Sequence, residues 1–281
     1  ESGVHVARHG RGYSRFEHNR HGIALDLLQF VPLDASIKVS RLRIRNLSGR
    51  SRHLTVTAYV EWVLGGSRAA SAPLILTEID PVTGAMFARN PWNTTYGSRV
   101  AFADLAGRQT DWTGDRRDFL GRHGTLAEPA ALLRPGRLSR HVGAGLDPCG
   151  ALQTTFSLEA GQEIEIVSLL GEAADATQAQ ALLGRYRSAD LDAVFRGVLA
   201  HWDQVLGTVQ VKTPDRSLDL ILNRWLLYQT LACRLWARSG FYQASGAFGF
   251  RDQLQDGMAL AISSPALTRE HLLRAAGRQF G

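Results

Sequence analysis

The chain has 281 residues, enough for one large domain or two domains of ordinary size. Hydrophobic residues make up 44% and charged residues 21%, which excludes a disordered chain and a coiled coil. The net charge of +6 comes from scattered arginines without interleaved aromatic residues, so nucleic-acid binding is not expected. Cys149 and Cys233 lack the spacing of a zinc site, so we expect buried free thiols and no metal.

The first 172 residues are predicted to form β-structure. Alternating apolar residues along 53–63 indicate a half-buried strand, with Trp62 on its core face. In the preceding strand, 37–45, the apolar positions change phase, which predicts a β-bulge. Residues 46–49 supply turn chemistry, so we expect these two strands to form an antiparallel hairpin.

A second hairpin is predicted from residues 152–158 and 164–168, which alternate on either side of an Ala-Gly turn. Shorter strands are expected at 74–79, 86–89 and 100–103. Many strands separated by Pro, Gly and Asn indicate a large antiparallel sandwich.

Helical spacing begins near residue 173 and predicts a helical linker over 173–212. Asp215 is the expected N-cap of a long helix that follows. Its predicted buried side includes Leu218, Leu222, Trp225, Leu226 and Trp236. Further helices should begin near Arg251 and at Ser264-Pro265. So few helices cannot close an all-helical domain, and we expect a truncated one.

The densest polar cluster is Arg251-Asp252-Gln253-Leu254-Gln255-Asp256, which follows a loop rich in glycine and aromatic residues. Sugar hydroxyls need such planar donors and acceptors, and sugar rings stack on aromatic side chains. On a helix Arg251 and Gln255 would share one face, and Asp252 and Asp256 another. An internal salt-bridge network would use the same residues, and periodicity does not decide between the two interpretations.

Two long motifs, residues 223–231 and 241–256, resemble glycoside hydrolase family 94. Residues 12–18 and 90–93 extend the resemblance along the chain, and within the family it is strongest to the phosphorylase-like region of bacterial cyclic β-1,2-glucan synthases. The resemblance implies a β + α multidomain fold. Its parts would be an N-terminal antiparallel β-supersandwich at 1–172, a helical linker at 173–212 and the first helices of a truncated (α/α)6 barrel at 213–281.

The resemblance also implies the chemistry, because related phosphorylases cleave β-glucosides with inorganic phosphate and invert the anomeric centre. One carboxylic acid protonates the leaving oxygen while phosphate takes the place of water. The general-acid aspartate and the phosphate-binding histidine of the family correspond to segments beyond residue 281. We therefore expect no catalytic residue in this chain, no metal and no cofactor, with phosphate as co-substrate.

Five residues are candidates for ligand binding by the same resemblance. Arg251 and Asp256 match the arginine and aspartate that hold sugar hydroxyls in the donor subsite. Tyr242 and Gln243 are expected to line the pocket by position. Arg238 matches an arginine near the phosphate, although a cation at a helix C-terminus explains it as well.

The expected parent is a cyclic β-1,2-glucan synthase at the cytoplasmic side of the bacterial inner membrane. The chain itself would be soluble, and its expected partners are β-glucan and the rest of its own barrel. The parent protein would also contain a membrane-embedded glycosyltransferase region. A homodimer is compatible with the sequence as well. The alternative is that the sandwich is a non-catalytic carbohydrate-binding or structural module. Linkage specificity and the use of phosphate stay open at this point.

Overall fold

The computed structural model of the protein describes residues 3–133, 136–236 and 250–277. The chain divides into two compact units, Glu1–Phe195 and Arg196–Gly281, which we call the sandwich unit and the helical unit. All described strands belong to the sandwich unit. None of the described helices combines the length and the apolar character that a membrane span requires.

Eight strands form the larger sheet of the sandwich unit, and each neighbouring pair is antiparallel. Their order is β1-β2-β3-β4-β11-β8-β7-β6, so β11 joins two groups of strands that come earlier in the chain. The strands are β1 (His5–Gly10), β2 (Tyr13–Arg20), β3 (Ile23–Phe30), β4 (Ile37–Asn46), β6 (Leu76–Ile79), β7 (Met86–Arg89), β8 (Val100–Asp104) and β11 (Glu163–Ala173).

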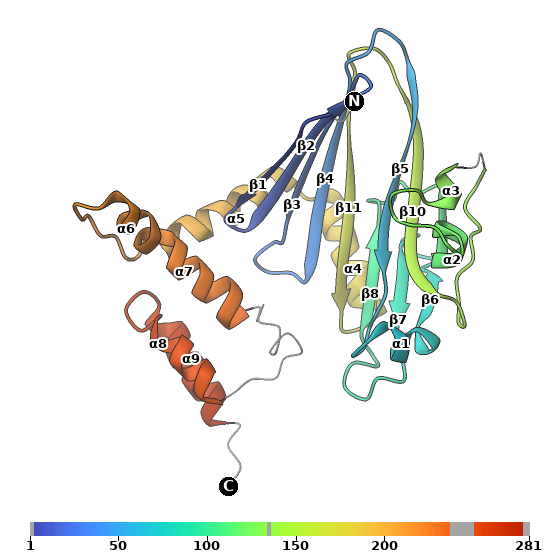
Figure 1. The fold of residues 1–281 in the computed structure, drawn as a ribbon. Coiled ribbons are helices and arrows are strands. Elements are labelled where there is room, and N and C mark those ends of the chain that lie inside the picture. The colour runs from blue at the N-terminus through green and yellow to red at the C-terminus, as the bar shows by residue number, and fades with distance from the viewer. Residues whose placement is uncertain (1–2, 134–135, 237–249, 278–281) are drawn as a thin grey trace. The chain divides into compact units, whose positions relative to one another are not determined.

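The smaller sheet has the order β5-β10-β9 and is also antiparallel. Its strands are β5 (Arg52–Glu61), β9 (Asp111–Asp115) and β10 (Pro148–Leu158). Figure 1 shows β5 and β10 opposite β4 and β11 of the larger sheet. Side chains from both sheets form one core, which includes Ile44, Trp62, Met86, Leu152 and Ile166. The predicted sandwich and the core position of Trp62 are therefore confirmed.

The two predicted hairpins are wrong, although all four strands exist. β4 and β5 lie in different sheets, as do β10 and β11, so β5 pairs with β10 and β4 with β11. Both connections cross between the sheets at the same end of the sandwich (Figure 1). Asn46 holds the first crossing, because its buried amide donates to the carbonyl oxygens of Arg50 at 2.8 Å and Leu158 at 2.9 Å. Alternation identifies the buried face of a strand but not its neighbour.

The predicted β-bulge in β4 is also wrong, since β4 pairs with both neighbours without a register shift. Its apolar pattern changes phase because both of its faces are covered. Ile44 points into the core between the sheets, whereas Val39 and Arg41 are buried on the opposite face. There the Arg41 guanidinium donates to Asp192 at 2.6 Å, at the start of α5 (Leu191–Leu206).

The helix α4 (Ala176–Ser188) packs against β8 and β11. Asp175 caps it by accepting from the Gln178 N–H at 2.8 Å, and Arg187 anchors its end through two bonds to the buried Asp104 at 2.7 and 2.9 Å. Helices α4 and α5 lie where the linker was predicted; the domain boundaries at residues 172 and 212 stay a prediction. The short helices of the sandwich unit are α1 (Arg68–Ser71), the 3-10 turn Ala72–Leu74, α2 (Arg116–Leu120) and α3 (Ala130–Leu133).

In the helical unit, α6 (Arg216–Leu220) begins at the predicted N-cap, where Asp215 accepts from the Ser217 N–H at 2.8 Å. The long helix predicted beyond it is interrupted, because Asn223 and Arg224 have non-helical backbone angles. The Asn223 amide makes two bonds to the Val211 backbone, at 2.6 and 2.7 Å, which compete with a regular helix. The following elements are the π-helical turn Ile221–Trp225, α7 (Leu226–Gln229), a second π-helical turn Thr230–Trp236, α8 (Phe250–Met258) and α9 (Pro265–Ala276).

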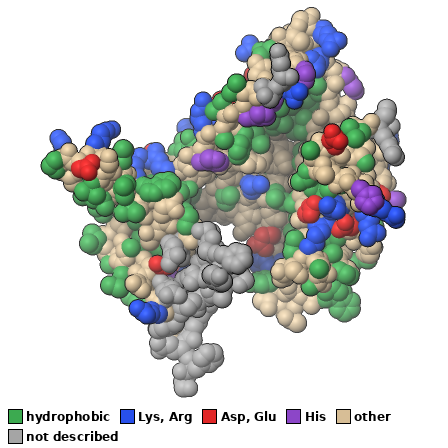
Figure 2. Space-filling model, in the orientation of Figure 1, with side chains coloured by type: hydrophobic (Ala, Val, Ile, Leu, Met, Phe, Trp, Pro, Cys, Tyr) green, Lys and Arg blue, Asp and Glu red, His purple; other side chains and the backbone are tan. Residues whose placement is uncertain are grey.

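The predicted buried side of the first helices is exposed. The apolar side chains concerned are Leu218, Leu222, Trp225, Leu226 and Trp236. Figure 2 shows hydrophobic side chains gathered over α6 and α7. The periodicity is real, but the described residues of the helical unit offer too few neighbours to cover this face.

Candidate functional site

The helix α8 carries the two residues expected to hold a sugar. Arg251 in its first turn is exposed, and Asp256 near its end is half-buried. Five residues along a helix correspond to about 7.5 Å of rise and about 140° of rotation, so the two side chains leave α8 on different sides. Asp256 takes part in an interaction within the protein. The helix thus keeps Arg251 and Asp256 near each other in space but on different faces.

Helix α9 contacts the C-terminal end of α8 and fixes it in place. The Thr268 hydroxyl donates to the Gly257 carbonyl oxygen at 3.2 Å. Gly257 is buried, and a Cβ atom there would lie 3.3 Å from the His271 ring, so glycine allows the two helices to approach. The packing of α8 against α9 at Gly257 therefore fixes the position of the neighbouring Asp256. The remaining candidates, Arg238, Tyr242 and Gln243, lie outside the described residues.

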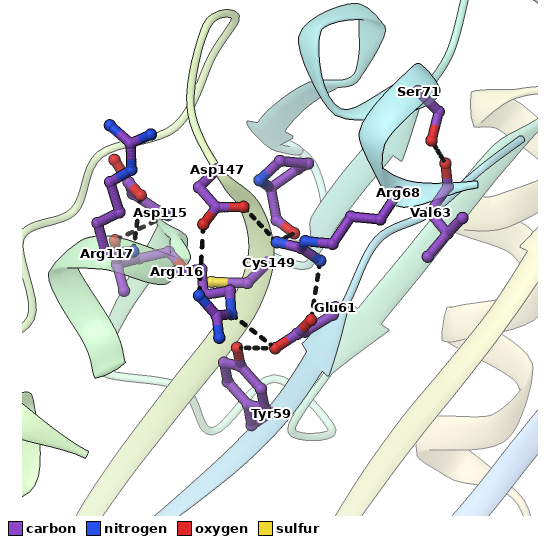
Figure 3. Close-up of polar contacts among 12 residues, drawn as sticks. Tyr59, Glu61, Val63, Arg68, Ser71, Asp115, Arg116, Arg117, Asp147 and Cys149 are labelled. Atoms are coloured by element: carbon purple, nitrogen blue, oxygen red, sulfur yellow. Dashed lines mark hydrogen bonds and ion pairs between the residues drawn. The ribbon is translucent and has the colours of Figure 1, made fainter. Parts of the chain in front are cut away.

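A second polar cluster lies at one end of the smaller sheet, and we call it the clamp. It consists of Tyr59, Glu61, Arg68, Arg116 and Asp147 (Figure 3). The Glu61 carboxylate accepts from the Tyr59 hydroxyl at 2.8 Å and from each of the two arginines at 2.9 Å. Asp147 pairs with the same two arginines, so two carboxylates and two guanidinium groups balance one another.

The clamp has no free nucleophile or base. Burial and the bond to Glu61 raise the pKa of Tyr59, so the phenol stays protonated at neutral pH. Burial raises the pKa of the neighbouring Cys149 thiol to about 12, which leaves it unreactive. Burial opposes ionisation of Glu61, but the bonds from Tyr59 and Arg116 and the charges of Arg68 and Arg116 together lower its pKa. These groups hold β5, α1, α2 and β10 together.

The segment after β5 is held by the clamp and lines a cleft of about 730 Å³. Residues 64–66 form one side, and the β7–β8 loop contributes Asn90, Asn93, Tyr96 and Arg99. Glu172 of β11 also lines it, and Ala101 of β8 completes it. Its volume lies in the range of small-molecule sites, about 300–1,000 Å³.

No role was predicted for Tyr96, Arg99 or Glu172. Tyr96 and Arg99 lie in the β7–β8 loop and Glu172 in β11, and only the fold brings these two stretches of sequence together. The signal that pointed toward them was the run at residues 90–93, which the resemblance included without a role. Among the described residues, no group of three His, Cys, Asp or Glu side chains could hold a metal ion.

One solved structure resembles the fold of this chain. A structure titled "Crystal structure of bacterial glucoamylase complexed with acarbose" superimposes with a TM-score of 0.53, covering 82% of this chain and 32% of that one. The sequences are only 6% identical, so this likeness concerns the fold alone.

Sequence comparison identifies the family. The model of "Glycosyl hydrolase 94, supersandwich domain" matches residues 1–189, and that of "Glycosyl hydrolase 94 superfamily, catalytic domain" matches residues 201–281. The chain belongs to the glycosyl hydrolase 94 family. The predicted resemblance and the predicted order of sandwich and helices are confirmed.

Two relatives show how much of such proteins this chain represents. It is 41% identical over 280 residues to "Cyclic beta-(1,2)-glucan synthase NdvB" of Rhizobium meliloti (strain 1021), covering 100% of this chain and 10% of the synthase. It is 28% identical over 274 residues to "N,N'-diacetylchitobiose phosphorylase" of Vibrio furnissii, covering 95% of this chain and 34% of the phosphorylase. The chain therefore spans about a tenth of the synthase and about a third of the phosphorylase.

Proposed function

We propose that this chain is the front portion of an inverting phosphorylase-like unit that acts on β-1,2-linked glucan within a cyclic β-1,2-glucan synthase. The observation that carries the proposal is the 41% identity to such a synthase along 280 residues. The similarity to a diacetylchitobiose phosphorylase supports phosphate as the attacking group. The parent protein would lie at the cytoplasmic side of the bacterial inner membrane and shorten glucan chains.

In this proposal, the residues of α8 bind and orient the sugar. Arg251 donates hydrogen bonds from its guanidinium fork to adjacent hydroxyls, and Asp256 accepts from another hydroxyl. Tyr242 and Gln243 would line the same pocket, and Arg238 would lie near the phosphate. The general acid belongs to a part of the catalytic domain that follows residue 281, and it protonates the oxygen of the leaving sugar while phosphate attacks from the opposite face.

Exposed apolar side chains of the two π-helical turns, Ile221–Trp225 and Thr230–Trp236, support the same proposal. Leu222, Trp225 and Trp236 expose large hydrophobic surfaces that a complete barrel would bury. The remaining barrel helices are the expected occupants. This chain alone should therefore release no glucose 1-phosphate from glucan and phosphate.

Substitution of Asp256 tests the proposal in the full-length protein. Asp256→Asn should lower the kcat/KM of phosphate-dependent glucan cleavage by about ten- to a hundredfold, because a charge-assisted bond to the sugar is lost. The measurement is the release of glucose 1-phosphate from β-1,2-glucan.

The matched control is Glu270→Gln on α9, which removes the carboxylate of an exposed Glu270–Arg274 pair. It should leave the rate unchanged. Equal rates in wild type and Asp256→Asn would reject the role of α8, and cleavage without phosphate would reject phosphorolysis.

A further inference from the structure

We propose that the cleft of the sandwich unit is a second glycan-binding site, which holds a segment of neutral glucan independently of α8. The choice of glucan as ligand rests on the proposed function. The site itself is argued from its charges, its exposed aromatic rings and the way its walls are held.

The first argument is charge. Arg99 and Glu172, which both line the cleft, form a two-bond pair, with Nη2 and Oε1 2.5 Å apart. The bond to Glu172 raises the pKa of Arg99, so the guanidinium stays charged. No other residue lining the cleft carries a charge. The lining thus has no net charge, which disfavours phosphates, nucleic acids and acidic sugars and suits an uncharged polyhydroxyl chain.

The second argument is the set of groups offered to a ligand. Arg99 has five N–H donors and uses two on Glu172, so further donors point outward from the pair. Asn93 accepts two backbone bonds through its amide oxygen, at 3.0 Å from Thr95 and 2.9 Å from Tyr96. Its amide nitrogen has no hydrogen-bond partner among the described residues. Vicinal hydroxyls of a pyranose match such planar donors and acceptors.

The third argument is exposed aromatic surface beside those polar groups. Tyr96 is 61% exposed in the cleft, and Trp92 on the same loop is 73% exposed. Large aromatic side chains at such exposure leave apolar faces in water. A sugar presents an apolar ring face and a polar rim, and it satisfies both kinds of group at once.

The fourth argument is that the walls are already in place. Asn90 is buried, and its amide donates to the Leu64 carbonyl oxygen at 2.9 Å, which joins the two sides of the cleft. Leu64 has a φ of 38°, an unfavourable backbone conformation for a leucine.

The clamp and Ser71, whose hydroxyl donates to the Val63 carbonyl oxygen, hold the strained segment at both ends (Figure 3). Gly65 allows the close approach, since a Cβ atom there would lie 2.9 Å from the Ser71 Cβ. Because the lining residues are already held in place, ligand binding costs them little conformational entropy.

The test is isothermal titration of the 281-residue chain with linear β-1,2-linked glucooligosaccharides. Wild-type chain should bind them, with an affinity that changes little with salt because the ligand is uncharged. Tyr96→Ala should weaken binding about tenfold, as expected for loss of a stacking ring. Tyr96→Phe keeps the ring and should retain most of the affinity. Unchanged thermal midpoints would show that all variants are folded.

Two further variants separate this inference from the proposed function. Arg251→Ala removes the sugar contact proposed for α8, so any glucan binding that remains in this variant is that of the cleft. Trp225→Ala removes an aromatic ring of the helical unit that is 57% exposed, close to the 61% of Tyr96, and should have no effect on binding.

Loss of all binding in Arg251→Ala, or full binding in Tyr96→Ala, would overturn the cleft as a site and leave the role of α8 standing. If the wild-type chain bound no glucooligosaccharide at all, the cleft would likewise be rejected as a glycan-binding site. Phosphorolysis by the full-length protein would still test α8 on its own.

Discussion

At the scale of single residues, burial decides which reactive groups are chemically silent. Cys149 lies in β10 opposite Glu61 of β5, is fully buried, and was expected from the sequence to be an inert thiol. Cys233, expected to be buried as well, is only half-buried. An apolar pattern around a cysteine predicts burial only where other elements cover both sides of the helix or strand. In the helical unit, one side of the segment that carries Cys233 is not covered.

The alkaline stability of the chain should depend on Cys149. Burial raises its pKa from 9.0 to about 12, so the folded state holds a proton that the unfolded state releases more readily. The thiol's contribution is complete below pH 9 and is lost as pH rises toward 12. Urea unfolding at pH 8 and pH 10.5 should therefore show a smaller loss of stability in Cys149→Ala than in wild type. Equal losses would mean that this thiol titrates normally.

Residues of the site were less predictable than residues of the core. The position of Arg251 and Asp256 on a helix followed from spacing, whereas their chemical role came only from the family resemblance and stays a prediction. Tyr96, Arg99 and Glu172 could not be found together by any local pattern, because the cleft depends on strand order. A cleft lined by two loops and two strands depends on topology and not on local residue spacing.

At the scale of elements, ion pairs fasten helices to the larger sheet. Arg41 and Arg43 share one face of β4 and both pair with Glu165 of β11, at 3.1 and 3.0 Å. Only the Arg41 side chain is buried, at 8% exposure against 47%, and only Arg41 also has a described bond to Asp192 of α5. The two arginines therefore form a natural comparison between a buried and an exposed pair.

Replacing each arginine should give unequal effects. Arg41→Met leaves two carboxylates without their buried partner and should lower the free energy of unfolding by about 2 kcal/mol. Arg43→Met should cost about 0.5 kcal/mol or less, since exposed pairs contribute little. Urea denaturation followed by circular dichroism measures both values. A similar effect for the two variants would mean that burial does not govern this contact.

Element boundaries were predicted better than element partners. β7 occupies the predicted residues 86–89, and α6 starts after the predicted cap, because alternation and capping are encoded locally. The hairpins failed because the turn residues 46–49 allow a crossing between sheets as readily as a hairpin. Asn46 stabilises the crossing through bonds to residues 50 and 158. The second partner is distant in sequence, so a local pattern cannot predict it.

At the scale of the whole molecule, the two units differ in how well their apolar surface is covered. The sandwich unit encloses a continuous core between its sheets, whereas α6 and α7 expose several large apolar side chains. On the face in Figure 2, the Arg and Lys side chains of the described residues lie in separate groups instead of one basic tract, in keeping with the expectation from composition. The helical unit should be the less stable of the two.

Hydrogen exchange should report this difference directly. Backbone amides of β4 and β11 should exchange slowly, and amides of residues 216–236 should exchange at least about a hundredfold faster, because local opening there exposes little additional apolar surface. Mass spectrometry of the chain, with the full-length protein as control, makes the comparison. The full-length protein should protect residues 216–236; equal protection of both segments in the chain itself would contradict this view.

The place of β11 also limits the order in which the chain can fold during translation. β11 lies between β4 and β8, and β10 lies between β5 and β9, so each sheet stays divided until residues 148–173 have left the ribosome. Before that point the nascent chain presents the open edges of β4 and β8, to which other strands can bind. A chain whose synthesis ends before residue 163 would thus contain two groups of strands with unpaired edges, which chaperones and proteases recognise.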